Sequence, residues 1–191
     1  MKLSCALILA SKSPRRREIL TKCGVEFAVK TAGVEELDSF DPLEKLPEQN
    51  ALLKAGAVAG SEKNSWVLGA DTMIIFEGRA IGKPQDLSDA FRMLESFSGK
   101  SHEVVSGMAL VNREKNEVFA WSEKSVVTFK PLTPAIISEY LAKVEVLDKA
   151  GAYAIQEYGD MIVESFTGEL ENIIGLPVEK LQQILKKCDI I

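Results

Sequence analysis

Hydrophobic residues in this chain occur in two patterns, short continuous runs and longer stretches in which they recur every three or four positions. Short β-prone runs are typical of strands, and helical spacing is typical of amphipathic helices. Strands are predicted at residues 4–10, 25–31, 66–70, 73–76, 102–112 and 117–129. Helices are predicted at residues 14–23 and 43–60, after a Ser88 cap, from Pro134, and from Pro177 to about Lys187. The alternation of the two patterns predicts an α/β protein.

Turn signals between the strands indicate how the sheet is connected. Residues 77–79 (Glu-Gly-Arg) read as a tight turn, and residues 113–116 connect the two longest predicted strands as a hairpin. Hairpins join antiparallel neighbours, so we expect a mixed sheet rather than a purely parallel one. In the helix after Ser88, the side chains of Phe91, Leu94 and Phe97 share one face.

The composition limits the class of protein. With 191 residues, of which 46% are hydrophobic and 27% charged, the chain is expected to form one domain over residues 1–191. The net charge of −5 argues against a nucleic-acid partner. No apolar stretch approaches the roughly 20 residues that span a membrane. Three separated cysteines and the single His102 exclude a disulfide framework and a Cys/His zinc site, which indicates a reduced, cytoplasmic setting.

The most informative segment is Ser11–Arg17, where an apolar strand ends and a helix begins. Ser13 stands at the N-cap position, and Pro14 stands at the first helical position. The N-terminus of a helix attracts anions, yet three arginines, Arg15–Arg17, occupy this first turn against the helix dipole. Guanidinium groups match phosphate oxygens two at a time, so the arrangement favours a triphosphate ligand. A solvated basic patch on an ordinary helix is the alternative.

Asp71 lies between two apolar strand runs and is therefore predicted at a strand end, facing a turn or a site. Its carboxylate could hold a divalent cation or deprotonate a water molecule, and Thr72 adds a hydroxyl beside it. Gly69 permits close backbone approach. An aspartate that bonds its own backbone in a turn is the structural alternative.

Other candidate residues carry weaker signals. Pro84 holds Lys83 extended, so the lysine ammonium can project into a cleft. Gln156 offers a donor and an acceptor, which suits the edge of a nucleobase, and Gly151 would let a flat ligand approach the backbone. Lys83 and Gln156 also fit ordinary surface positions. His102 follows a turn and is expected to be structural.

Taken in order, several segments resemble the Maf family of nucleoside triphosphate pyrophosphatases. The matching segments are Ser11-Lys12-Ser13-Pro14-Arg15-Arg16 with Ile19 and Leu20, Gly69-Ala70-Asp71-Thr72, Gly82-Lys83-Pro84, Ser98-Gly99 with His102, residues 149–156 (Lys-Ala-Gly-Ala-Tyr-Ala-Ile-Gln) and Gly175-Leu176-Pro177. They span nearly the whole chain. Each segment is modest evidence, and the six in this order make a specific match.

The resemblance implies an α/β fold with an elongated mixed sheet flanked by helices, two lobes and a central cleft, related in architecture to inosine-triphosphate house-cleaning enzymes. It implies a pyrophosphatase that hydrolyses dTTP and UTP between the α and β phosphates and releases the monophosphate and pyrophosphate. Modified pyrimidine nucleotides are further candidate substrates. A divalent cation, Mg²⁺ or Mn²⁺, and a homodimer are also implied.

The resemblance also assigns roles to residues. It makes Asp71 the proton acceptor, and by their charge Glu36 and Asp71 are expected to hold the metal. The substrate-binding residues that it implies are Ser11, Ser13, Arg15, Arg16, Lys54, Thr72, Lys83, Lys149 and Gln156. Among these, Arg15, Thr72 and Gln156 match the branch that acts on dTTP and UTP rather than the branch that resembles 7-methyl-GTP pyrophosphatases.

Two positions depart from the family pattern, and two other functions stay open. Ser106 stands where a threonine is common, and residues 167–172 are unusually acidic; neither is expected to touch the proposed chemistry. One alternative function is a non-catalytic, nucleotide-binding regulator of cell division, since Maf proteins have been linked with septum formation. The other is a purine pyrophosphatase that acts on inosine or xanthosine triphosphate.

Overall fold

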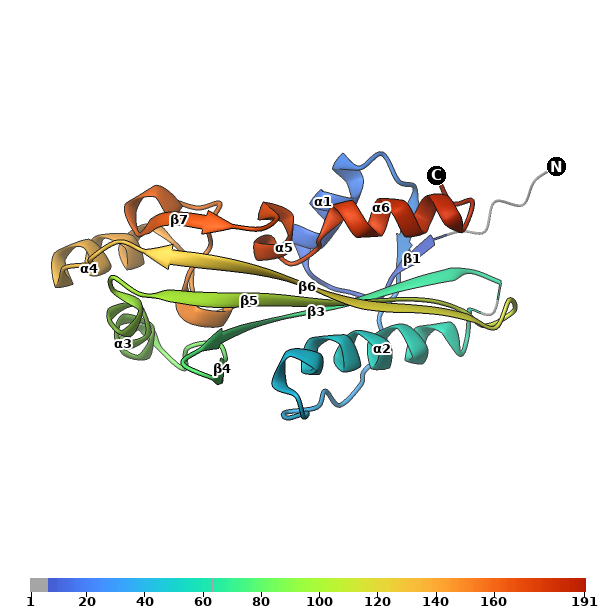
Figure 1. The fold of residues 1–191 in the computed structure, drawn as a ribbon, viewed down its shortest axis with the longest axis horizontal. Coiled ribbons are helices and arrows are strands. Elements are labelled where there is room, and N and C mark those ends of the chain that lie inside the picture. The colour runs from blue at the N-terminus through green and yellow to red at the C-terminus, as the bar shows by residue number, and fades with distance from the viewer. Residues whose placement is uncertain (1–6, 63) are drawn as a thin grey trace. The chain divides into compact units, whose positions relative to one another are not determined.

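The computed structural model describes residues 7–62 and 64–191, which contain a seven-stranded sheet with flanking helices (Figure 1). The strands are β1 (Leu7–Leu9), β2 (Phe27–Val29), β3 (Trp66–Phe76), β4 (Arg79–Ile81), β5 (Ser101–Asn112), β6 (Glu117–Phe129) and β7 (Val163–Thr167). The helices are α1 (Pro14–Lys22), α2 (Leu46–Ala59), α3 (Leu87–Phe97), α4 (Pro134–Lys143), α5 (Leu170–Ile174) and α6 (Val178–Lys187), with short 3-10 helices at Leu43–Lys45, Ala150–Ala152 and Gly159–Met161. In this part of the chain no helix is long and apolar enough to cross a membrane.

The sheet is mixed, as the sequence predicts. Its strand order is β2-β1-β3-β5-β6-β7, and β4 pairs with β3 off this path. Strand β1 runs parallel to β2 and β3, whereas β4 pairs antiparallel with β3, and β7 with β6. The expected α/β class is therefore confirmed. Residues 4–6 of the predicted first strand lie outside the described residues.

The chain forms two compact units, each assembled from segments that are distant in the sequence. The first unit contains the described residues up to Thr72 together with Ser106–Glu123 and Gly175–Ile191. Within it, α2 covers one face of the sheet, and α1 and α6 lie on the opposite face (Figure 1). The second unit contains Met73–Val105 and Lys124–Ile174.

The core of the second unit is formed by α3, α4 and the strands on which they pack. Its largest side chains are almost fully buried and belong to one hydrophobic cluster: Leu94, Phe97, Phe129, Ile137 and Tyr140. Phe91 packs against the same cluster, so the apolar face predicted for α3 is the buried one. The predicted turn after β3 is also present, with positive φ at Glu77 and Gly78.

Two glycines allow α2 to lie directly against the sheet of the first unit. A Cβ added to Gly69 on β3 would lie 2.2 Å from the carbonyl oxygen of Ala51, and one added to Gly107 on β5 would lie 2.1 Å from the backbone nitrogen of Glu48. On the helix side, Ala51 and Ala55 are fully buried. Helix backbone therefore meets strand backbone here, which fixes the side chains of α2 relative to β3 and β5.

Helix α1 begins and ends at the residues that the sequence indicates. Ser13 has an extended N-cap conformation, and its hydroxyl accepts a hydrogen bond from the backbone nitrogen of Arg16 at 3.5 Å. Pro14 is the first helical residue. Gly24, with a φ of 70°, follows the C-cap residue Cys23. A capping hydroxyl and a left-handed glycine thus set the two ends.

Two local predictions are wrong. Asp71 does not end a strand, because β3 is continuous from Trp66 to Phe76; the carboxylate is tolerated within the strand because α2 supplies partners for it. The cap of α3 is Asp86 rather than Ser88, and its carboxylate accepts from the backbone nitrogen of Asp89 at 2.7 Å. Aspartate and serine are equally good caps, so the sequence pattern does not separate them.

His102 lies in the aromatic core of the second unit. Its ring centroid is 5.0 Å from that of Phe97, 5.6 Å from that of Phe129 and 5.5 Å from that of Tyr153. The residue is 3% exposed, and among the described residues neither ring nitrogen has a hydrogen-bond partner. Burial lowers the pKa of His102 to about 4, an effect only partly offset by the backbone of Glu103. The expected structural role is therefore confirmed.

The lowered pKa of His102 predicts stability that depends on pH. The unfolded state has the ordinary histidine pKa of about 6.5, so it binds more protons than the folded state between about pH 6.5 and 4. The free energy of unfolding should fall by up to about 3 kcal/mol as the pH is lowered through this range. Urea denaturation at a series of pH values measures how steeply the free energy of unfolding changes with pH. This dependence should be weaker in His102→Phe. An equal slope in that variant would contradict the prediction.

The close contact at Gly69 predicts that this position tolerates no side chain. Gly69→Ala should lower the free energy of unfolding by about 3 kcal/mol or more, because the helix must move to admit the methyl group. Gly56→Ala on α2 is the matched control, since a Cβ there would meet, among the described residues beyond the backbone of α2, just the Arg113 guanidinium at 3.8 Å. That change should stabilise the helix by up to about 1 kcal/mol. Urea denaturation compares the variants, and similar effects at both positions would refute the argument.

Candidate active site

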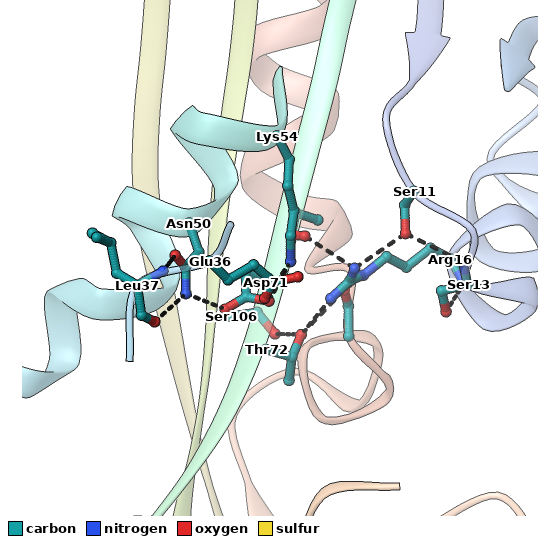
Figure 2. Close-up of polar contacts among 12 residues, drawn as sticks. Ser11, Ser13, Arg16, Glu36, Leu37, Asn50, Lys54, Asp71, Thr72 and Ser106 are labelled. Atoms are coloured by element: carbon teal, nitrogen blue, oxygen red, sulfur yellow. Dashed lines mark hydrogen bonds and ion pairs between the residues drawn. The ribbon is translucent and has the colours of Figure 1, made fainter. Parts of the chain in front are cut away.

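The serines and arginines at the start of α1 lie in the first unit. Figure 2 shows Ser11, Ser13 and Arg16. The hydroxyl of Ser11 accepts from the backbone nitrogen of Ser13 at 3.3 Å, and Ser11 itself is buried. Arg15 is half-buried and Arg17 is exposed. The predicted contacts of Ser11, Ser13 and Arg15 with a substrate stay predictions.

The guanidinium of Arg16 connects segments that are far apart in the sequence. Its Nε donates to the carbonyl oxygen of Gly175 at 2.8 Å. Its Nη1 donates to the carbonyl oxygen of Ala70 at 3.0 Å and to the hydroxyl of Ser11 at 3.2 Å. Its Nη2 donates to Oγ1 of Thr72 at 3.1 Å. These hydrogen bonds tie the start of α1 to β3 and to the loop before α6.

The acceptors in this set are all neutral, so the charge of Arg16 is not cancelled by the groups that it contacts. Burial, the largest effect, lowers the pKa of the Arg16 guanidinium, and repulsion by Arg15 lowers it further. Attraction by the carboxylates of Asp71 and Glu36 opposes both effects. The guanidinium is therefore electrostatically coupled to two acidic residues that lie nearby without bonding to it.

These two carboxylates meet at the ammonium of Lys54 (Figure 2). Lys54 Nζ is 2.7 Å from Asp71 Oδ1 and 3.0 Å from Glu36 Oε2. The side chains of Lys54 and Asp71 are 16% and 17% exposed, whereas that of Glu36 is 51% exposed. The structure thus brings together three predicted site residues from separate segments, with the Asp71–Lys54 pair shielded and Glu36 at the solvent side.

Strand and helix geometry explain this convergence. Side chains alternate along β3, so Asp71 projects to the face of Gly69, where α2 lies, and Thr72 projects to the opposite face. On α2, Asn50 and Lys54 are four residues apart and therefore lie on the same side of the helix. Asn50 Nδ2 donates to Asp71 Oδ2 at 3.3 Å, so both carboxylate oxygens have a partner on α2.

Sequence reasoning misses Asn50, although this side chain contacts the predicted proton acceptor. Asn50 is 3% exposed and lies in a segment whose pattern indicates only an amphipathic helix. The one available signal is its spacing, one helical turn before Lys54. That signal says nothing about Asp71 until the packing of α2 on β3 is known.

Ser106 contacts Thr72, one of the predicted substrate-binding residues. Its hydroxyl lies 2.9 Å from Oγ1 of Thr72, because β3 and β5 are neighbours and both side chains project to the same face. Thr72 Oγ1 also lies 3.5 Å from the carbonyl oxygen of Gly175. Gly175 has a φ of 121°, a conformation that favours glycine. The departure at Ser106 therefore alters the immediate surroundings of Thr72.

The remaining predicted substrate residues, Lys83, Lys149 and Gln156, belong to the second unit. Within that unit the backbone nitrogen of Gly151 donates to the carbonyl oxygen of Gly82 at 3.0 Å. Two of the motif segments therefore lie side by side. Lys83 and Gln156 are exposed, as a ligand-binding role requires.

Lys149, by contrast, is buried and makes ionic contacts within its own loop. Its ammonium lies 2.9 Å from Asp148 Oδ1 and 3.7 Å from Glu157 Oε1, and it donates to the carbonyl oxygen of Glu145. These contacts hold the loop that leads to Gln156. The predicted contact of Lys149 with a substrate stays a prediction.

Tyr140 fixes the same loop from α4. Its hydroxyl accepts from the backbone nitrogen of Ala154 at 3.0 Å and donates to the carbonyl oxygen of Ala154 at 3.3 Å. Burial raises the pKa of Tyr140 to about 12, so the hydroxyl keeps its proton for this contact. Tyr140 therefore fixes both the N–H and the C=O group of Ala154, which lies two residues before Gln156.

Two acidic residues, Glu36 and Asp71, could hold a divalent cation if substrate phosphates supplied its other ligands. Within the described residues, no group of three or more His, Cys, Asp or Glu side chains could hold a metal ion. Glu36 and Asp71 nevertheless converge on one cation, the Lys54 ammonium. One or two carboxylates completed by substrate phosphates are a usual environment for Mg²⁺. The donor set is therefore compatible with Mg²⁺ or Mn²⁺.

The hydrogen bonds of Arg16 predict that lysine cannot replace it. Arg16→Lys keeps the charge but loses the planar fork that reaches Gly175, Ala70 and Thr72. The free energy of unfolding should fall by about 2–4 kcal/mol, because several acceptors lose their donors. Arg17→Lys, at an exposed position of the same helix, should change it by less than about 0.5 kcal/mol. Urea denaturation measures both, and equal stabilities would contradict the prediction.

Comparison with solved structures supports the fold. The structure of the Ham1 protein of Staphylococcus aureus matches 95% of this chain and 98% of its own, with a TM-score of 0.56 and 15% sequence identity. At this identity the likeness concerns the fold alone. It agrees with the expected Maf and inosine-triphosphatase-like architecture.

Comparison of sequences identifies the family. A dTTP/UTP pyrophosphatase of Bacillus cytotoxicus is 43% identical over 183 residues, covering 95% of each chain. A protein of the same name from Akkermansia muciniphila is 42% identical over 180 residues, covering 94% of each chain. The family model described as "Maf-like protein" matches residues 6–188. With relatives this similar and a family match over nearly its whole length, the chain belongs to the Maf family.

Proposed function

We propose that this protein is a nucleoside triphosphate pyrophosphatase that hydrolyses dTTP and UTP to the monophosphate and pyrophosphate. Membership of the Maf family and the names of its relatives support this activity. The observation that carries the proposal is the placement of the Asp71 carboxylate between the cations of two helices. Lys54 on α2 bonds it directly, and Arg16 on α1 attracts it without a direct bond.

In this mechanism Asp71 acts as the general base. Its carboxylate accepts a proton from the attacking water, whose oxygen forms the new bond to phosphorus while the bond between the α and β phosphates breaks. Pyrophosphate is the leaving group. Lys54 and Asn50 fix the carboxylate by one oxygen each, so the base is oriented before the substrate arrives.

Cationic residues are proposed to bind the polyphosphate and to offset its charge. Arg15, Arg16, Lys54 and Lys83 supply this charge, with the hydroxyls of Ser11 and Ser13 at the start of α1. Among the described residues the hydrogen bonds of Arg16 use four of its five N–H groups, which leaves one for a phosphate oxygen. Lys149 also belongs to the proposed substrate-binding set.

A divalent cation completes the proposed site. Glu36 and Asp71 would hold it, and Mg²⁺ or Mn²⁺ supplies charge stabilisation for the departing pyrophosphate when bound. The protein residues supply the base and the orientation of the substrate. Recognition of the pyrimidine is assigned to Gln156 and Thr72, of which Gln156 is exposed and Thr72 is fixed by Arg16 and Ser106.

Two further properties stay predictions: a homodimer, which the resemblance implies, and a cytoplasmic location, which the cysteine content indicates.

The decisive experiment is a pyrophosphate-release assay over a panel of triphosphates with Mg²⁺ or Mn²⁺. The panel contains dTTP, UTP, modified uridine triphosphates, and inosine and xanthosine triphosphates. Preferential hydrolysis of dTTP and UTP supports the proposal. Binding without pyrophosphate release would instead favour the regulator, and hydrolysis confined to inosine and xanthosine triphosphates would favour the purine enzyme.

Asp71→Asn tests the assignment of the base. This substitution keeps the size of the side chain but removes the proton acceptor, so kcat for dTTP should fall by about 10²-fold or more while nucleotide binding persists. Pyrophosphate release and nucleotide titration measure the two properties. Glu35→Gln, at the exposed residue beside Glu36, is a matched control and should keep full activity. Near-normal turnover by Asp71→Asn would refute the assignment.

A further inference from the structure

We propose that Asn50 is a positioning residue for the reaction, which holds the Asp71 carboxylate and the segment carrying Glu36 in one arrangement. This inference rests on the proposed role of Asp71 as proton acceptor. Asn50 lies outside the motifs that carry the family resemblance, and it is one of the few buried polar residues of the first unit. Burial of an amide is costly unless its polar groups are hydrogen-bonded, and those of Asn50 are bonded to Leu37 and Asp71.

The side-chain amide of Asn50 is fully used. Its Oδ1 accepts from the backbone nitrogen of Leu37 at 2.8 Å. Its Nδ2 donates to the carbonyl oxygen of Leu37 at 3.2 Å and to Asp71 Oδ2 at 3.3 Å (Figure 2). An amide with both N–H groups and its oxygen engaged has one orientation only, because a flip would place N–H against N–H at Leu37.

The contact with Asp71 sets the orientation of the carboxylate. Lys54 binds Oδ1 and Asn50 binds Oδ2, so rotation about the terminal bond of Asp71 would break one or both contacts. A general base needs its accepting lone pair directed at the water. With Lys54 as its one partner the carboxylate could still rotate, and the second hydrogen bond, from Asn50, prevents this rotation.

The contact with Leu37 fixes the segment that carries Glu36. Residues 31–41 form neither helix nor strand, so they belong to no helix or β-ladder that would position them. Asn50 bonds both polar backbone groups of Leu37, as a neighbouring strand would. Glu36 is the adjacent residue and reaches Lys54 at 3.0 Å. One amide therefore sets the positions of both carboxylates.

The neutrality of asparagine matters as much as its shape. Glu36, Asp71 and Lys54 together carry a net charge of −1, which suits attraction of a cation or a water proton. A second cation at position 50 would cancel that charge, and an anion would repel Asp71. An amide donates a hydrogen bond without either effect.

The test uses Asn50→Asp in the full-length protein, with dTTP as substrate. Aspartate keeps the size and the acceptor for the Leu37 nitrogen, but at pH 8 it cannot donate to Asp71. We expect kcat to fall by about 10-fold or more, with KM for dTTP changed by less than about 3-fold, since the interaction acts on the base. Asn50→Ala removes the amide without adding charge and should also lower kcat by about 10-fold. Gln49→Glu, which adds the same charge at the preceding residue, should leave kcat within about 2-fold.

Urea denaturation of each variant confirms that the folded state is the one assayed. An unchanged kcat in Asn50→Asp or in Asn50→Ala would overturn the inference. A rise in KM alone would also overturn it, because that is the result expected of a residue that merely holds the loop. The result for Asp71→Asn separates this failure from failure of the proposed function. If Asp71→Asn is inactive and the Asn50 variants are normal, only the role of Asn50 is lost; if Asp71→Asn is active, the proposed base is wrong as well.

Discussion

The direct contact of helix and strand backbones at Gly69 and Gly107 is the constraint on which the site depends. Lys54 and Asn50 reach Asp71 only because nothing larger than hydrogen separates α2 from β3 and β5 at these positions. The small side chains of Ala51 and Ala55 continue the same close contact on the helix side. The close packing of the helix and strand backbones therefore also determines the positions of the polar side chains in the candidate site.

The second constraint keeps the Arg16 guanidinium apart from the Asp71 carboxylate. A site for a polyanion needs cations and a carboxylate close together, and such groups tend to collapse into ion pairs that leave nothing for the ligand. Here Arg16 is held by neutral acceptors, the carbonyl oxygens of Ala70 and Gly175 and the hydroxyls of Ser11 and Thr72. It therefore stays near Asp71 without pairing with it, and Asp71 is bound by Lys54 instead.

The sequence predicts what is encoded within a few neighbouring residues. The Ser13 cap, the Pro14 start, the turn at Glu77 and the hairpin between β5 and β6 follow from local chemistry, and all are present. The mixed character of the sheet follows from the hairpins in the same way.

Features that arise from packing could not be predicted in this way. The continuity of β3 through Asp71 depends on partners from α2, and the roles of Asn50 and Ser106 depend on which elements lie beside β3. Asp71 lies in a segment that carries the resemblance, whereas Lys54 and Glu36 lie outside those segments, and the sequence indicates each of the three residues separately. Their meeting at a single ammonium is a property of the folded chain, which neither spacing nor composition contains.

The alternation of side chains along β3 has a consequence for how this protein can change over time. Consecutive residues Asp71 and Thr72 serve opposite sides of one sheet, so insertion or deletion of a single amino acid upstream in that strand would exchange their directions. The hydroxyl would then meet the ammonium, and the acid would meet the guanidinium. Evolution can therefore swap side chains here one at a time, but a change in the length of this stretch would separate both side chains from their present partners at once.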